Sequence, residues 1–146
     1  MGSLTCFFID RGSDINSRDE ISFTPLHATS RCRHVNVARV LLDSGSNVNA
    51  RETRSWTALH YASWQGYLDL AWLLIDCGAD VNAWREDCWT PLHQVSRNGY
   101  LDIARLLINR CADVNAQEKH RSTPASRVLR LAPRHSKVAD RLWRKY

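Results

Sequence analysis

Apolar residues recur at helical spacing in three segments of this chain. Within each segment, two adjacent pairs lie three to four positions apart, so that their side chains share one face of a helix. The three sets are Val37, Ala38, Leu41 and Leu42; Leu70, Ala71, Leu74 and Ile75; and Ile103, Ala104, Leu107 and Ile108. Each set begins 33 residues after the previous one. The pattern predicts three amphipathic helices that recur with a fixed period.

A shorter helix is predicted before each of these, because one tetrapeptide occurs three times with the same period. The copies are Thr24–His27, Thr57–His60 and Thr90–His93. The threonine suits the cap of a helix, where its side chain accepts from free backbone amides. Pro25 and Pro91 suit the first helical position, where the missing N–H would have been unpaired anyway. A period of this length is typical of stacked supersecondary units rather than one closed core.

Glycines predict where the helices end. Gly66 and Gly99 separate the two helices of a unit, and Arg33 holds this place in the first unit. The residues that end the second helices are Gly12, Gly45 and Gly78. A left-handed glycine commonly stops a helix in this way. Cys111 holds the same place in the third unit, and we expect an altered turn there, because positive φ strains a residue other than glycine.

The second unit carries the most complete set of these markers. It contains Thr57–His60, then Gly66, then Leu73-Leu74-Ile75, and closes on Gly78-Ala79-Asp80-Val81-Asn82-Ala83. This pattern resembles an ankyrin repeat. The resemblance implies an all-α solenoid of stacked helix–turn–helix units, joined by fingers that end in β-turns or hairpins.

The resemblance divides the single domain, residues 1–146, into five parts. Residues 18–50, 51–83 and 84–116 are three repeats, and residues 1–17 match the second half of a truncated repeat. Residues 117–146 form a divergent basic capping repeat, in which Pro133 predicts a longer loop. Ankyrin repeats usually carry glycine two positions before the threonine, where this chain has Ser22, Ser55, Cys88 and Arg121. We therefore expect finger tips of another turn type, or tips that are less well fixed.

The family binds partners on the concave face, which is made by the finger tips and the first helices. Transferred onto this chain, that face carries an aromatic ladder, neighbouring tip residues and residues from the first helices. They are Phe23, Trp56 and Trp89; Ile21, Arg54 and Asp87; and Arg31, Trp64 and Arg97. Aromatic residues and arginine are enriched at protein interfaces. We expect a non-enzymatic module that binds a protein or peptide here, although Trp56 and Trp89 could instead only pack along the fingers.

Charge suggests a second function. The net charge of +5 divides into +7 on residues 117–146 and −2 on residues 1–116. The basic residues of the last unit are Arg121, Arg127, Arg130, Arg134, Lys137, Arg141, Arg144 and Lys145, with Lys119 beside them. Nucleic-acid or anionic-surface binding through this unit is one alternative, and a solvated cap is the simpler interpretation. A docking subunit of an enzyme complex is a third reading that the sequence does not separate from the first.

Other chemistry finds little support in the sequence. The histidines of the tetrapeptide recur about 10 Å apart if helix pairs stack at the usual distance, too far to share a metal ion. The resemblance implies instead that each forms a structural hydrogen bond to the next unit. No nucleotide-binding or catalytic motif occurs, so we expect no cofactor.

Five cysteines without a CxxC motif favour free thiols in an intracellular compartment, cytoplasmic or nuclear. No apolar run is long enough to span a membrane. We expect a monomer, with self-association through the uncovered N-terminal end as the alternative.

Overall fold

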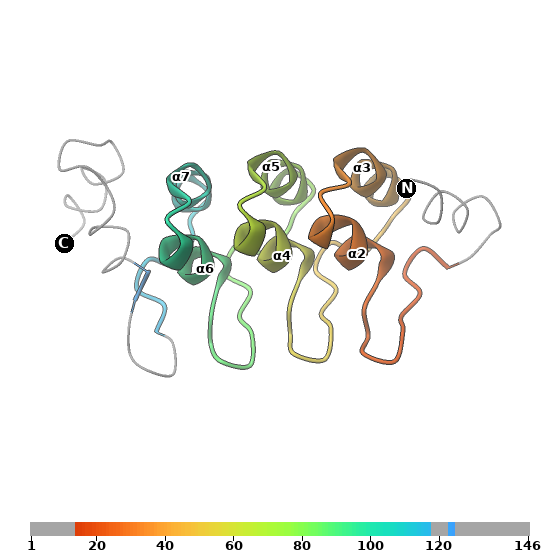
Figure 1. Cartoon of the computed structure of the whole chain (residues 1–146), viewed down its shortest axis with the longest axis horizontal. Coiled ribbons are helices and arrows are strands. Elements are labelled where there is room, and N and C mark those ends of the chain that lie inside the picture. Colours follow the sequence, from red (N-terminus) through yellow and green to blue (C-terminus); the bar gives the residue numbers. More distant parts are fainter. Residues whose placement is uncertain (1–13, 118–122, 125–146) are drawn as a thin grey trace.

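Six α-helices, and no strand, occur in the computed structural model, which describes residues 14–117 and 123–124. They are α2 (Pro25–Arg31), α3 (Val35–Asp43), α4 (Ala58–Gln65), α5 (Leu68–Asp76), α6 (Pro91–Asn98) and α7 (Leu101–Asn109). The helices stand in two layers, with α2, α4 and α6 beside the long fingers and α3, α5 and α7 above them (Figure 1). This arrangement confirms the predicted all-α solenoid of stacked helix pairs.

The tetrapeptide begins each first helix as predicted. Thr57 has extended backbone angles and caps α4, where its hydroxyl accepts from the His60 N–H at 3.4 Å. In return, the Thr57 N–H donates to Nδ1 of His60 at 3.2 Å. Threonine and histidine therefore form a reciprocal capping pair at the start of the helix. Thr90 and His93 repeat this reciprocal pair at the start of α6.

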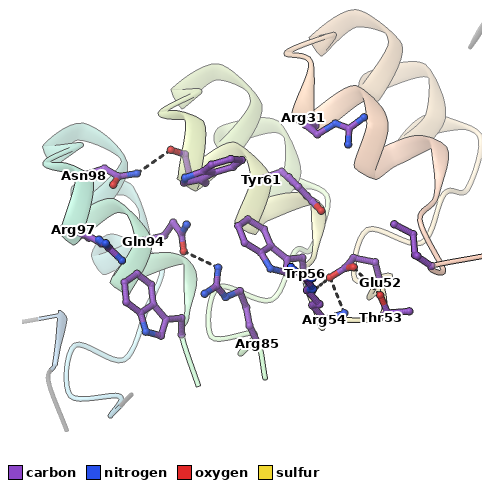
Figure 2. Close-up of a pocket in the computed structure, with 13 residues that line it drawn as sticks. Arg31, Glu52, Thr53, Arg54, Trp56, Tyr61, Arg85, Gln94, Arg97 and Asn98 are labelled. Atoms are coloured by element: carbon purple, nitrogen blue, oxygen red, sulfur yellow. Dashed lines mark hydrogen bonds between the residues drawn. The ribbon is translucent and has the colours of Figure 1, made fainter. Parts of the chain in front are cut away.

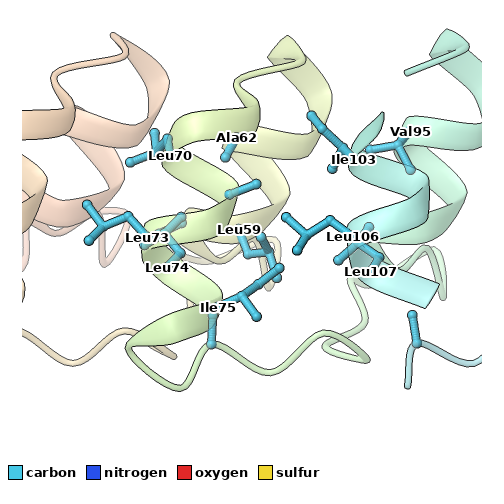
Figure 3. Close-up of a cluster of buried hydrophobic side chains, with 14 of the residues drawn as sticks. Leu59, Ala62, Leu70, Leu73, Leu74, Ile75, Val95, Ile103, Leu106 and Leu107 are labelled. Atoms are coloured by element: carbon cyan, nitrogen blue, oxygen red, sulfur yellow. The ribbon is translucent and has the colours of Figure 1, made fainter. Parts of the chain in front are cut away.

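The hydrophobic core lies between neighbouring helix pairs rather than at one centre. Leu59 of α4, Leu74 of α5 and Leu107 of α7 are fully buried, and the cluster runs on from one pair to the next (Figure 3). Helix α4 packs against both α2 and α6, and α5 packs against both α3 and α7. Each unit therefore depends on its neighbours for burial, as expected of a solenoid. Leu73 and Leu106, which the predicted apolar faces omitted, are also buried.

The altered turn expected at Cys111 is absent, and that prediction is wrong. Cys111 adopts φ 65°, in the same left-handed region as Gly45 and Gly78. Its N–H donates to the Ile108 carbonyl at 3.2 Å, just as Gly78 donates to Ile75. The turn is also held from the preceding unit, because Asn82 donates its side-chain N–H to the Cys111 carbonyl at 3.3 Å. These bonds offset a left-handed strain of about 1–2 kcal/mol.

The finger tips also keep one conformation, which corrects the expectation of a different or looser turn. Ser22, Ser55 and Cys88 have φ between 60° and 63°, the region that favours the usual glycine. In each tip the same backbone bond closes the turn, for example from Ser55 N–H to the Glu52 carbonyl at 2.8 Å. The Glu52 carboxylate adds bonds from the amides of Arg54 and Trp56, at 2.9 and 3.0 Å. Side-chain acceptors therefore fix the tips.

Several predictions concern residues outside the described part of the chain. They include residues 1–13 of the truncated unit predicted over residues 1–17, most of the basic capping unit, the tip residue Arg121 and the loop at Pro133. Within the described part, no helix has the length and apolar character needed to cross a membrane.

Candidate partner-binding groove

A groove of about 840 Å³ runs along the inner face, between the fingers and the layer of α2, α4 and α6 (Figure 2). Its lining residues are Ile21, Arg31, Glu52, Thr53, Arg54, Trp56, Tyr61, Trp64, Arg85, Trp89, Gln94, Arg97 and Asn98. Seven of the nine residues predicted to meet a partner line this groove. The other two, Phe23 and Asp87, do not line it but contact Tyr61 and Arg85, which do.

The predicted aromatic ladder exists, but its members do not contact one another directly. Tyr61 stands between the first two: its ring centroid lies 5.8 Å from that of Phe23 and 4.8 Å from that of Trp56. Trp64, one turn further along α4, meets Trp56 edge-on at 5.7 Å. The middle unit therefore carries a continuous aromatic cluster, and Trp64 is its most exposed member, with 45% of its surface accessible.

Arg85 fills the gap between the second and third rungs. Its guanidinium carbon lies 4.4 Å from the ring centroid of Trp56 and 5.4 Å from that of Trp89. It forms an ion pair with Asp87 and donates to the side-chain oxygen of Gln94 at 3.4 Å. Only 13% of the Arg85 side chain is exposed, so it is a structural part of the groove wall.

Sequence reasoning missed Arg85, although the repeat register contains a signal for it. The equivalent positions in the first two units hold Asp19 and Glu52, whose carboxylates accept from finger amides. Arg85 cannot accept, and Asp87 takes over by accepting from the Trp89 N–H at 3.2 Å. Partial burial raises the pKa of Asp87, but the hydrogen bonds from Arg85 and the Trp89 amide outweigh it and hold this pKa below its usual value. The carboxylate is therefore ionised at neutral pH.

Two other arginines of the groove lie on aromatic rings without an acidic partner in the described residues. Arg31 stands over the ring of Phe23 at 5.0 Å, and Arg97 over that of Trp89 at 5.3 Å. Among the described residues the ion pairs are Arg33–Asp69, Arg85–Asp87 and Arg110–Asp76, none of which includes Arg31, Arg54 or Arg97. The one carboxylate in the groove wall, Glu52, is 7% exposed and accepts from its own finger. The groove therefore presents positive charge around an aromatic centre.

Buried histidines fix the wall from behind. Nε2 of His27 lies 3.0 Å from the Trp56 carbonyl, and Nε2 of His60 lies 3.2 Å from the Trp89 carbonyl. Because Nδ1 accepts from the threonine N–H, the ring proton must be on Nε2 and is donated to the next unit. Burial lowers the pKa of both rings, that of His60 to about 3, so they stay neutral. These bonds confirm the predicted structural role of His27 and His60.

Metal chemistry has no geometric support in residues 14–117 and 123–124, where no three His, Cys, Asp or Glu side chains are placed to hold an ion. The free cysteines there, Cys32, Cys77, Cys88 and Cys111, are exposed. The inner face thus combines aromatic rings and guanidinium groups on a helical-repeat solenoid.

Comparison with known families identifies this solenoid. A family model described as ankyrin repeats (3 copies) matches residues 2–84, and one described as ankyrin repeats (many copies) matches residues 65–108. The first match alone covers more than half of the chain, which therefore belongs to the ankyrin-repeat family. Proteins of this kind are generally protein–protein interaction modules. A search of curated proteins found no match to the chain.

Proposed function

We propose that this chain is a non-enzymatic adaptor that binds a protein partner, through an extended segment of that partner, in the inner groove. The observation that carries the proposal is the exposed Trp64 amid arginines that have no acidic partner in the described residues. An exposed aromatic patch is typical of an interaction surface. Partner binding would desolvate the rings and pair the guanidinium groups at the same time.

Packing alone explains only part of this wall. Trp56 and Trp89 are half-buried and hold Arg85 between them, so both contribute to the structure of the fingers. Trp64 differs, because its contact with Trp56 leaves almost half of its surface open to solvent. In this proposal the half-buried rings form the base of the groove, and Trp64 is the apolar anchor for the partner.

Single-stranded nucleic acid fits the wall less well than a peptide. Bases bind such platforms by stacking on free aromatic faces. Here Trp56 has Arg85 and Tyr61 against it, and Trp89 has Arg85 and Arg97. Guanidinium groups already occupy the positions that bases would need. Nucleic-acid binding would then depend on the basic last unit, which lies outside the described residues.

An intracellular location accompanies this proposal. The four cysteines of the described part are free and exposed, in keeping with a reducing compartment. An adaptor of this kind could equally dock a catalytic partner, and the same groove would then carry that contact.

The chain offers a matched pair of variants for the test. Trp64 faces the groove, whereas Trp72 of α5 lies outside it with nearly the same exposure, 44% against 45%. Proteins captured from a native extract by the intact chain would be compared with those captured by Trp64→Ala and Trp72→Ala. We expect Trp64→Ala to lose the specific partner and Trp72→Ala to keep it. Equal capture by all three would contradict the proposal.

A further inference from the structure

The ends of the three inner helices carry an arginine, a tryptophan and an arginine in equivalent places. Arg31, Trp64 and Arg97 are 33 residues apart, and each stands eight residues after a rung of the aromatic ladder. All three are exposed and line the groove. The repeat therefore places one apolar anchor midway between two cations.

The two cations are held in a geometry that suits carboxylates. Arg31 lies over the ring of Phe23 and Arg97 over that of Trp89, so each guanidinium has an aromatic surface on one side. Stacking uses the face of the guanidinium and leaves the N–H groups at its edge available. A carboxylate binds that edge through two parallel hydrogen bonds. Neither arginine has an ion-pair partner in residues 14–117 and 123–124.

The spacing of the repeats sets the length of the ligand. Neighbouring helices pack about 10 Å apart, so two repeats separate the outer arginines by about 20 Å. A polyproline II segment advances about 3.1 Å per residue with three residues per turn. Side chains at positions i, i+3 and i+6 of such a segment share one side and span about 19 Å. A β-strand would instead turn the middle side chain away from the other two.

We propose that the groove recognises an acidic peptide in the polyproline II conformation, with carboxylates six positions apart and a large apolar side chain midway. The carboxylates pair with Arg31 and Arg97, and the apolar side chain packs on Trp64. The described part of the chain has no strand whose edge could pair with a ligand backbone, and polyproline II needs no such edge. This inference rests on the proposed function and adds the chemistry of the partner.

The test uses the whole chain and a fluorescein-labelled heptapeptide with glutamate at both ends and phenylalanine in the middle, separated by prolines and alanines. Two control peptides replace both glutamates by glutamine, or bring the glutamates three positions apart. Fluorescence anisotropy gives the dissociation constant. We expect about tenfold weaker binding for the peptide whose glutamates lie three positions apart, which loses one charge-assisted contact, and about a hundredfold weaker binding for the glutamine peptide, which loses both.

Variants of the chain assign the contacts. Arg31→Gln and Arg97→Gln should each weaken binding of the acidic heptapeptide about tenfold and leave the glutamine peptide unaffected. Arg39→Gln is the matched control, because Arg39 is exposed on α3 and does not line the groove. Circular dichroism checks that the variants stay folded, which exposed positions should allow.

The possible results distinguish a failure of this inference from a failure of the proposed partner-binding function. If the glutamine peptide binds as well as the acidic one, and both depend on Trp64, the groove binds peptides but the inferred chemistry is wrong. The same holds if no heptapeptide binds while capture of a native partner still depends on Trp64. If a thymidine oligonucleotide displaces the peptide and needs Arg31 and Arg97 for its own binding, the surface is a nucleic-acid site and both proposals fail.

Discussion

Trp64 and Trp72 lie on consecutive helices of one repeat, with almost the same exposed fraction, yet in different surroundings. Trp64 faces the groove beside arginines that have no acidic partner in the described residues. Trp72, on the outer layer of helices, has Arg110 over its ring at 4.9 Å, and Arg110 is already paired with Asp76 at 2.9 Å. Exposure alone therefore does not identify a binding site. In the proposal made here, the hydrogen-bonding capacity left on the neighbouring arginines distinguishes Trp64 from Trp72.

The largest expected effect is a loss of stability in acid that arises in the inner layer of helices. Buried histidines occur in α2, α4 and α6 but not in α3, α5 or α7. Folded His60 stays neutral down to about pH 3, whereas an unfolded histidine is protonated below about 6.5. In this window the unfolded state binds more protons. The free energy of unfolding should therefore fall as pH is lowered, by about 1.4 kcal/mol per pH unit for His60 alone, and should be unaffected above the window.

Urea denaturation at neutral pH and at about pH 5 measures this slope, in a range where most carboxylates remain ionised. His60→Gln should lower stability at neutral pH and flatten the slope. A wild-type stability that does not change between these two conditions would show that the histidine bonds do not control the inner layer.

The turn that links the two layers of helices should give the next largest effect on stability. Gly66 links α4 to α5 at φ 79°, and a Cβ there would meet the Tyr100 ring at 2.8 Å. Gly66→Ala combines left-handed strain with a clash, and we expect a loss of about 3 kcal/mol. Gly45 also has positive φ, but a Cβ there meets nothing within 4 Å. Gly45→Ala should cost only the strain, about 1–2 kcal/mol, and thermal unfolding of the two variants gives the difference. Equal losses would place the whole cost in the backbone and none in the ring of Tyr100.

Arg85 in the groove wall and Arg110 beside the outer layer make the same kinds of contact with different exposure to solvent. Each lies over tryptophan and pairs with an aspartate, but Arg85 is 13% exposed and Arg110 is 36% exposed. We expect Arg85→Ala to lose about 2–3 kcal/mol, because it leaves Asp87 and Gln94 without their partner in the wall. Arg110→Ala should lose less than about 1 kcal/mol, as solvent screens its pair. Denaturation midpoints of the two variants measure the two losses. A larger loss for Arg110→Ala would show that the exposed ion pair, rather than the one in the groove wall, contributes more to stability.

The smallest expected difference is between the two tryptophans themselves. Trp64→Ala removes an edge-on aromatic contact and Trp72→Ala removes a cation–π contact. Each loss should lower the free energy of unfolding by about 1 kcal/mol or less. Their melting temperatures should therefore nearly coincide, while partner capture separates them. A marked drop in melting temperature for Trp64→Ala alone would make Trp64 a packing residue rather than an anchor.

The repeat register predicted most of the fold because its signals are local. The threonine caps and the first-position prolines follow from spacing within one 33-residue unit. The His60 bond to the Trp89 carbonyl was implied by the family resemblance. Local signals failed at Cys111 and at the finger tips. There, a bond donated by the Asn82 side chain and bonds accepted by the Glu52 carboxylate hold turns in which residues other than glycine are left-handed.

The inner face was predicted less completely, since seven of nine expected residues line the groove but its organisation was not foreseen. Tyr61 and Arg85 enter the aromatic ladder between its rungs, and neither was singled out. Both contacts join residues of different units. Side chains of this length reach neighbours that the repeat pattern alone does not specify.

The sequence by itself determined the period and the identity of the family, because recurring residues at fixed spacing carry both. It also determined the helix starts, because these depend on local backbone bonds. Only the tertiary structure decided which charges remain available. The Arg33 guanidinium lies 3.3 Å from the Asp69 carboxylate and that of Arg110 lies 2.9 Å from the Asp76 carboxylate, whereas Arg31 and Arg97 have no ion-pair partner in the described residues. Partner choice among these arginines follows from which side chains the stacking of units brings within reach, and that stacking exists only in the folded chain.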